Sequence, residues 1–181
     1  MDKPIEYERV FLLSGARGAG KTTVLQKLLK NLISRGMHVA GILSLPVEEA
    51  GEKIAIDGID LRSGETRRLA IRNKGASGQW ITRQWQFDAQ AMQWADRVLE
   101  NSTPCELLVI DELGVLEFER NRGWLAGLKA VDDGLYHHAI VVIRPELLEK
   151  AQKRWASAVV INISPKNRSA CIESLINSIK T

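Results

Sequence analysis

The feature that most constrains the fold of this chain is the stretch SGARGAGKTT at residues 14–23. It holds three glycines and a lysine followed by two threonines, and it separates the apolar run VFLLS from a leucine-rich stretch. Glycines give the backbone the freedom to turn sharply or to point successive N–H groups inward. The stretch therefore predicts either a tight strand-to-helix turn or a seat for phosphate.

Residues 15–22 match the pattern G-x-x-x-x-G-K-S/T at every fixed position, with a predicted strand before them and a predicted helix after them. In this motif the backbone N–H groups of the loop and the helix N-terminus cradle phosphate oxygens. Lys21 would reach the β- and γ-phosphates, and the Thr22 hydroxyl would bind Mg²⁺. The alternative is a glycine-rich turn with an incidental lysine. The predicted phosphate-binding residues are Gly15, Ala16, Arg17, Gly18, Ala19, Gly20, Lys21, Thr22 and Thr23.

The other half of such a site is an apolar strand that ends in an acid, and LLVIDELG at residues 107–114 has this form. Asp111 would hold Mg²⁺ through a water, and Glu112 would polarise the water that attacks the γ-phosphate. The alternative for Asp111 is a cap or turn residue. The alternative for Glu112 is a solvated or salt-bridged acid.

Apolar strands and amphipathic helices alternate along the chain. Strands are predicted at residues 10–14, 38–45, 105–114, 138–143 and 158–163, and helices at residues 22–35, 87–101, 124–131, 146–155 and 171–179. This alternation predicts an α/β fold, a three-layer sandwich whose mostly parallel sheet carries helices on both faces. Residues 46–83 alternate without a helical stripe and carry the turn RSGE, which predicts an antiparallel β-hairpin insert at the sheet edge.

Composition narrows the class of protein. A chain of 181 residues that is 45% apolar suits one domain over residues 1–181. It has no run of 18 apolar residues, and its charged start MDKPIEYERV lacks the apolar core of a secretion signal, so we expect a cytoplasmic protein without membrane contact. The 25 basic residues are mixed with 22 acidic ones, so the net charge of +3 argues against nucleic acid as a partner.

Four other side chains carry expectations. Cys105 and Cys171 stand far apart in the sequence and are expected to be core thiols, not a disulfide. Trp80 and Trp85 lie in the polar stretch SGQWITRQWQF, where either could be buried, stack on a nucleotide base, or contact a protein partner through the insert.

The order of these motifs resembles the small P-loop nucleoside-triphosphatase family, whose animal members are called cancer-related nucleoside triphosphatases and whose archaeal and bacterial members are of the THEP type. IDELGVLE is similar to the family pattern I-D-E-I/L-G-x-M-E, and NR at residues 167–168 is similar to the family's N-R before the last helix. The resemblance implies that Asp111, Glu112 and Glu117 occupy the family's acidic positions. It also implies that Asn167 and Arg168 lie on the loop after the last strand, where P-loop proteins often contact the base.

The chain also departs from this family pattern, which points to a divergent branch. Leu116 replaces methionine, and Arg144-Pro145 stands where the family usually has threonine after a strand. An arginine at the end of a parallel strand faces the crevice where ligands bind, so Arg144 could neutralise charge on the γ-phosphate. Arg17 competes for that role, and the alternative for either arginine is an ion pair with a surface acid.

Three functions fit these observations. The first is a Mg²⁺-dependent nucleoside-triphosphatase that splits ATP or GTP, with broad base preference by resemblance, into diphosphate and phosphate. The second is a slow nucleotide-dependent switch that signals to a partner protein. The third is a kinase for a small acceptor or a nucleotide, in which Glu112 or Glu117 takes the proton of the acceptor. The absence of an arginine-rich lid segment and the family resemblance favour hydrolysis.

Overall fold

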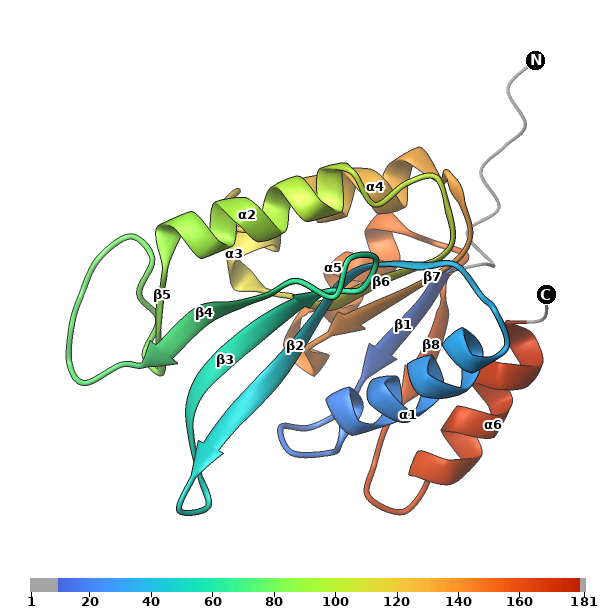
Figure 1. Cartoon of the computed structure of the whole chain (residues 1–181), viewed down its shortest axis with the longest axis horizontal. Helices are drawn as coiled ribbons and strands as arrows, with labels where there is room; N and C mark the ends of the chain where they lie inside the picture. Colours follow the sequence, from blue (N-terminus) through green and yellow to red (C-terminus); the bar gives the residue numbers. More distant parts are fainter. Residues whose placement is uncertain (1–9, 180–181) are drawn as a thin grey trace.

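The computed structural model describes residues 10–179. The charged start MDKPIEYERV, on which the expectation about a secretion signal rests, therefore lies outside the described residues except for Val10. Within them, eight strands form one sheet in the order β5-β4-β3-β2-β6-β7-β1-β8 (Figure 1). The strands are β1 (Val10–Ser14), β2 (Val39–Glu49), β3 (Glu52–Asp60), β4 (Thr66–Arg72), β5 (Trp85–Phe87), β6 (Cys105–Leu113), β7 (Tyr136–Ile143) and β8 (Val159–Asn162). Strands β2, β6, β7, β1 and β8 pair in parallel, and the rest pair antiparallel.

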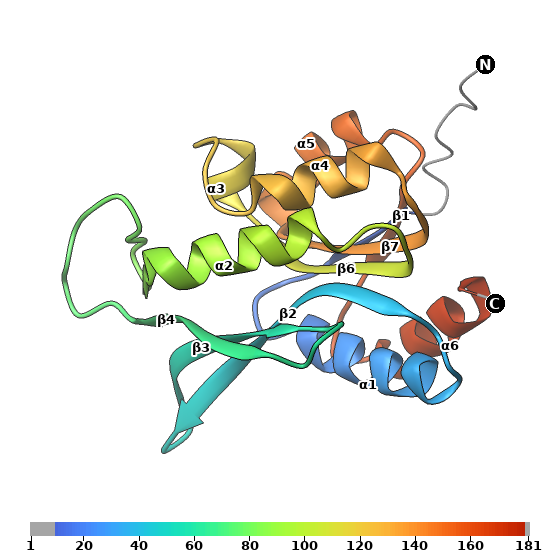
Figure 2. The same cartoon turned by 45° about the horizontal axis from the view of Figure 1, so that its top comes forward.

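Helices cover both faces of the parallel part of the sheet, which confirms the predicted three-layer α/β fold (Figure 2). The helices are α1 (Lys21–Ser34), α2 (Ala89–Glu100), α3 (Val115–Phe118), α4 (Leu125–Asp133), α5 (Leu148–Arg154), α6 (Arg168–Ser178) and the short 3₁₀ helix η2 (Pro145–Leu147). Helices α1 and α6 lie on one face, and α2, α4 and α5 lie on the other. No helix within residues 10–179 is long and apolar enough to span a membrane.

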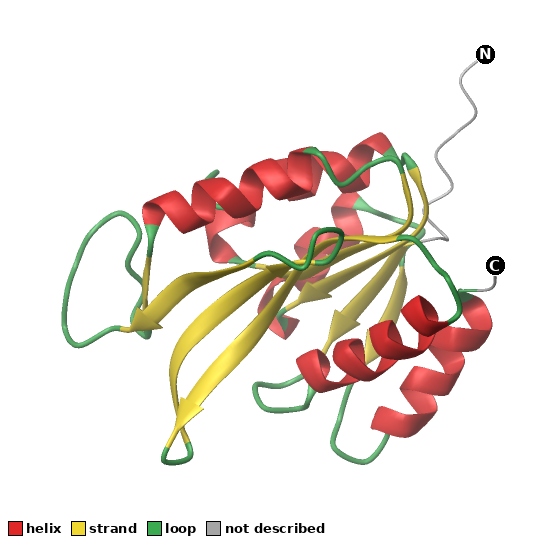
Figure 3. Ribbon diagram, viewed as in Figure 1, coloured by secondary structure: helices red, strands yellow, loops and turns green. Residues whose placement is uncertain are grey.

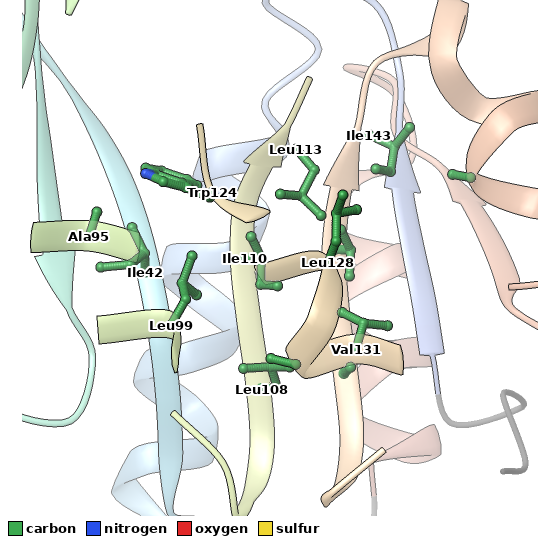
Figure 4. Close-up of a cluster of buried hydrophobic side chains, with 14 of the residues drawn as sticks. Ile42, Ala95, Leu99, Leu108, Ile110, Leu113, Trp124, Leu128, Val131 and Ile143 are labelled. Atoms are coloured by element: carbon green, nitrogen blue, oxygen red, sulfur yellow. The ribbon is translucent and has the colours of Figure 1, made fainter. Parts of the chain in front are cut away.

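The core owes its shape to the alternation of side chains along the parallel strands. Leu107 and Val109 of β6 pack toward α1, whereas Leu108 and Ile110 pack toward α2 and α4. Figure 4 shows the second of these layers, in which Leu108 and Ile110 meet side chains of both helices. Strands buried on both faces must be apolar throughout, so the polar residues at their carboxyl ends mark where the core stops and the site begins.

The insert is larger than the hairpin predicted at residues 46–83. Strand β2 does not end at residue 45: its first half pairs in parallel with β6, and it then continues to Glu49 as the first strand of an antiparallel hairpin with β3. The antiparallel unit ends only at Phe87, in β5 (Figure 3). The residues PVEE after the apolar half of β2 hid this continuation, because they interrupt the apolar run. A strand that leaves the core no longer needs apolar residues.

The remaining side chains singled out in the sequence lie as follows. Trp80 is half-buried and packs against the core cluster on the α2 side, and Trp85 is half-buried in β5. Both cysteines are free thiols, as predicted, and burial raises the pKa of Cys105 to about 11.

Candidate active site

The phosphate loop connects β1 to α1 at the carboxyl edge of the sheet. Gly15, Gly18 and Gly20 all have positive φ angles, of 149°, 77° and 96°. A Cβ at Gly15 would overlap the carbonyl oxygen of Ile163, so glycine is required there for space as well as for conformation. Gly20 is the N-cap of α1 and offers no side chain to its first turn. The first N–H groups of α1 are therefore left without a side-chain cap beside the loop.

Lys21 lies over this loop. Its Nζ donates to the carbonyl oxygens of Gly15, at 2.7 Å, and Ala16, at 3.2 Å. Both acceptors are neutral, so a phosphate oxygen in the loop would be a stronger partner for the ammonium group. Arg17, at the tip of the loop, is exposed, as is Thr23 on α1.

Asp111 is the buried carboxylate of the site, 3% exposed at the end of β6. Its Oδ2 accepts hydrogen bonds from the Thr22 hydroxyl, at 3.4 Å, and from the Ser44 N–H, at 3.3 Å. Burial raises the pKa of Asp111 to about 7, the charge of Glu112 adds to the rise, and the two hydrogen bonds and the charge of Lys21 oppose it. The carboxyl group is thus held ready to ionise near neutral pH.

Ser44, at the end of the parallel half of β2, was missed in the sequence. Its hydroxyl donates to the Asp111 carbonyl oxygen at 2.5 Å, in addition to the bond from its N–H. The signal was available, because AGILS has the same form as FLLS before the phosphate loop: a polar residue that ends an apolar parallel strand. Ser44 fixes the backbone and the side chain of Asp111 together.

Glu112 and Arg144 form an ion pair between neighbouring strands. Arg144 follows β7, and its Nε donates to Oε1 of Glu112 at the end of β6. The Glu112 side chain is 30% exposed and that of Arg144 is 50% exposed, so solvent reaches the pair. An ion pair was the alternative weighed from the sequence for each of these two residues, and the structure pairs them with each other.

Glu117 is a buried carboxylate with both oxygens engaged by the backbone. Its Oε2 accepts from the Gly114 N–H at 2.7 Å, and its Oε1 accepts from the Trp124 N–H at 2.9 Å. Burial raises the pKa of Glu117, and these hydrogen bonds oppose the rise. Glu117 therefore joins the two ends of the segment that follows Asp111 and Glu112. Its side chain is buried, and that of Glu112 is more exposed.

The residues predicted to contact the base lie where β8 leads into α6. Asn167 uses its side chain within this loop: Oδ1 accepts from the Ser164 N–H at 2.8 Å, and Nδ2 donates to the Asn162 carbonyl at 2.8 Å. Arg168 is the first residue of α6 and faces the phosphate loop, where its Nε donates to the Ala19 carbonyl at 2.7 Å.

Comparison with known proteins identifies the family of this chain. Residues 10–176 match the model of the NTPase family. Nucleoside-triphosphatase THEP1 of Caldivirga maquilingensis is 25% identical over 170 residues, which cover 93% of this chain and 94% of that protein. Nucleoside-triphosphatase THEP1 of Thermofilum pendens is 32% identical over 125 residues, 67% of each chain.

Solved structures share the fold. The solution structure of a human cancer-related nucleoside triphosphatase superposes with a TM-score of 0.72 at 25% identity, over 95% of this chain and 97% of that one. The crystal structure of THEP1 from Aquifex aeolicus gives a TM-score of 0.70 at 18% identity, over 95% and 99% of the two chains, which shows likeness of fold alone. With the family model matched over residues 10–176, this chain belongs to the NTPase family and is a P-loop enzyme of the nucleoside-triphosphatase class.

Proposed function

We propose that this chain hydrolyses nucleoside triphosphates to the diphosphate and inorganic phosphate in a Mg²⁺-dependent reaction, by in-line attack of water on the γ-phosphorus. The observation that carries the proposal is the contact of Thr22, at the end of the glycine loop, with Asp111, whose carboxylate lies 3.4 Å from the Thr22 hydroxyl. Glu112 is the next residue in the chain. Phosphoryl transfer needs little covalent chemistry from the protein, so positioning and charge neutralisation supply the catalysis.

The donor set fits Mg²⁺. Hydroxyl and carboxylate oxygens are the ligands that this hard cation prefers, and it commonly takes one or two from the protein and the rest from phosphates and water. Thr22 would bind Mg²⁺ directly, and Asp111 would hold it through a water. When bound, Mg²⁺ would neutralise charge on the β- and γ-phosphates. Asp111 must be ionised to serve, and a carboxyl with a pKa of about 7 releases its proton readily at neutral pH.

The loop and Lys21 bind the triphosphate. Its oxygens would accept from the inward N–H groups between residues 15 and 23, while the Lys21 ammonium exchanges the carbonyls of Gly15 and Ala16 for the β- and γ-phosphates. Phosphate oxygens carry negative charge and the two carbonyls are neutral, so the attraction between opposite charges drives this exchange.

Glu112 takes the proton of the attacking water, and Arg144 works through it. The arginine Nε holds one carboxylate oxygen and leaves the other to meet the water. This assignment replaces the direct γ-phosphate contact that the sequence suggested for Arg144, and a double-mutant cycle separates the two. If Arg144 acts through Glu112, Arg144→Ala lowers kcat in the wild type but has no further effect in the Glu112→Gln background. If it contacts phosphate, the two losses multiply.

Acceptor-free phosphate release tests the proposed function. The assay uses ATP, GTP, CTP and UTP, each with Mg²⁺ and with a chelator, and compares wild type with Lys21→Ala and Lys30→Ala. Lys30 is an exposed lysine on the same helix and serves as the control. We expect slow release from all four nucleotides that needs Mg²⁺ and is lost only in Lys21→Ala. Release that continues at the wild-type rate in Lys21→Ala would overturn the assignment of the loop.

Some of the sequence predictions stay predictions. The preference among bases, the protein partner of the insert and the cytoplasmic location belong to this group. A slow switch, the second function weighed from the sequence, would show a near-zero basal rate that rises in cell lysate, so it is tested by repeating the assay with added lysate.

A further inference from the structure

Arg168 contacts the phosphate loop from outside. Its Nε donates to the Ala19 carbonyl at 2.7 Å, and its Nη2 donates to the Gly18 carbonyl at 3.4 Å. Arg168 and Ala19 are 149 positions apart in the sequence, so this hydrogen bond joins the two ends of the fold. A guanidinium group that offers two donors to neighbouring carbonyls holds them in a fixed relative orientation.

Gly20 makes room for this arginine. A Cβ at Gly20 would lie 2.7 Å from Cζ and 3.0 Å from Nη2 of Arg168, which is closer than van der Waals contact allows. The guanidinium therefore lies directly on the Cα of the last loop glycine. Gly20 is needed both for its positive φ of 96° and for this close approach.

The bond to Ala19 determines where the Gly20 N–H points. In a planar trans peptide the C=O and the following N–H point in opposite directions. Because Arg168 holds the Ala19 carbonyl on the outer side of the loop, the Gly20 N–H is directed to the inner side, where phosphate would lie. The Ala19 N–H is not free for this purpose, since it donates to the Ala16 carbonyl at 3.0 Å.

Asn167 holds the backbone from which Arg168 reaches. Its side chain closes the loop between Asn162 and Ser164, and α6 packs against α1 beyond it (Figure 2). Asn167 thus fixes the loop after β8, and Arg168 joins this loop to the phosphate loop.

From these contacts we infer that Arg168 is a positioning residue for the phosphate loop, and that it supports recognition of the triphosphate chain whatever the base. This inference deepens the proposed function, since it concerns phosphate binding at the same site, and it differs from the base contact expected from the sequence. It also gives a physical reason for the expected breadth of nucleotide use, because two donors of Arg168 bind loop carbonyls.

The test uses a ligand without a base. Calorimetric Kd values with Mg²⁺ are measured for inorganic tripolyphosphate and for the β,γ-imido analogues of ATP and GTP, in wild type, Arg168→Ala and Arg168→Lys. Lys166→Ala is the control, since Lys166 is an exposed cation on the same loop. We expect Arg168→Ala to weaken binding of all three ligands alike, by about tenfold, because it removes the charge-assisted hydrogen bonds that hold the Ala19 and Gly18 carbonyls. Arg168→Lys should recover part of this loss of affinity.

Two results would overturn the inference. One is a loss confined to the ATP or GTP analogue with tripolyphosphate binding unchanged, which would return Arg168 to the base. The other is unchanged binding of all three ligands in Arg168→Ala. Binding is measured without turnover, so a wild-type protein that binds tripolyphosphate yet releases no phosphate from NTP would contradict the proposed function while leaving this inference intact.

Discussion

Replacing Asp111 by asparagine should change how the stability of the protein depends on pH. The carboxyl is buried, and its pKa is raised from an ordinary 3.8 to about 7, with burial as the largest cause. In the range between these values the folded protein holds a proton that the unfolded chain has released. The protonated carboxyl therefore contributes stability that is fully present below pH 3.8 and is lost as the pH rises through 7.

The size of the effect follows from the pKa change. At 1.36 kcal/mol for each pH unit, a rise from 3.8 to about 7 corresponds to about 4 kcal/mol of unfolding free energy, of which about 3 kcal/mol falls between roughly pH 5 and pH 8.5. Asparagine has the shape of the protonated acid and can accept the same bonds from Thr22 and Ser44, but it cannot ionise. The free energy of unfolding of Asp111→Asn should therefore rise relative to that of the wild type as the pH rises.

Urea unfolding from about pH 5 to 8.5 measures this difference, in a chelating buffer without nucleotide, because a bound cation would favour the ionised form. The quantity of interest is the stability of Asp111→Asn minus that of the wild type, since it cancels the titration of Asp96 and Glu117. Glu112→Gln removes the charge that is the second cause of the raised pKa of Asp111. Its stability relative to the wild type should change with pH in the same direction as that of Asp111→Asn, but less. Parallel pH curves for Asp111→Asn and the wild type would refute the reasoning.

Three further substitutions test other parts of the site. Glu112→Gln should bind Mg²⁺ and nucleotide like the wild type but lose about 10²–10⁴-fold in kcat, and an equal loss of binding would make Glu112 a structural acid. Ser44→Ala removes the hydroxyl bond to the Asp111 carbonyl and should raise the Mg²⁺ concentration for half-maximal turnover by about three- to tenfold; an unchanged Mg²⁺ titration would exclude this role. Gly123→Ala places a Cβ on Oε1 of Glu117 at a φ of 79° and should cost about 2–4 kcal/mol in urea unfolding, whereas a loss under about 0.5 kcal/mol would contradict the packing.

The sequence predicts the parts of the fold and site that depend on local pattern. The glycine loop, its flanking strand and helix, and the acids after the apolar half of β6 each lie within one short stretch of consecutive residues, and each is where it was expected. The parallel direction of the core strands also follows from the alternation of strands with helices.

The pairings across strands could not be predicted, because they depend on register. Ser44 meets Asp111 only because the parallel pairing of β2 with β6 places Ile42 beside Ile110, and residues 67 positions apart carry no local signal. The Arg144–Glu112 pair depends in the same way on β6 and β7, where a register shift between Ile110 and Leu113 turns the chain just beside Glu112.

The central claim is that water attacks the γ-phosphorus, and hydrolysis in ¹⁸O-labelled water tests it most directly. The wild-type protein is incubated with Mg²⁺ and ATP under single-turnover conditions without any other acceptor, and the products are analysed by mass spectrometry. Attack at the γ-phosphorus predicts one ¹⁸O atom in each inorganic phosphate and none in the ADP. Label in the ADP, or phosphate transfer that begins only when a small acceptor is added, would contradict the account.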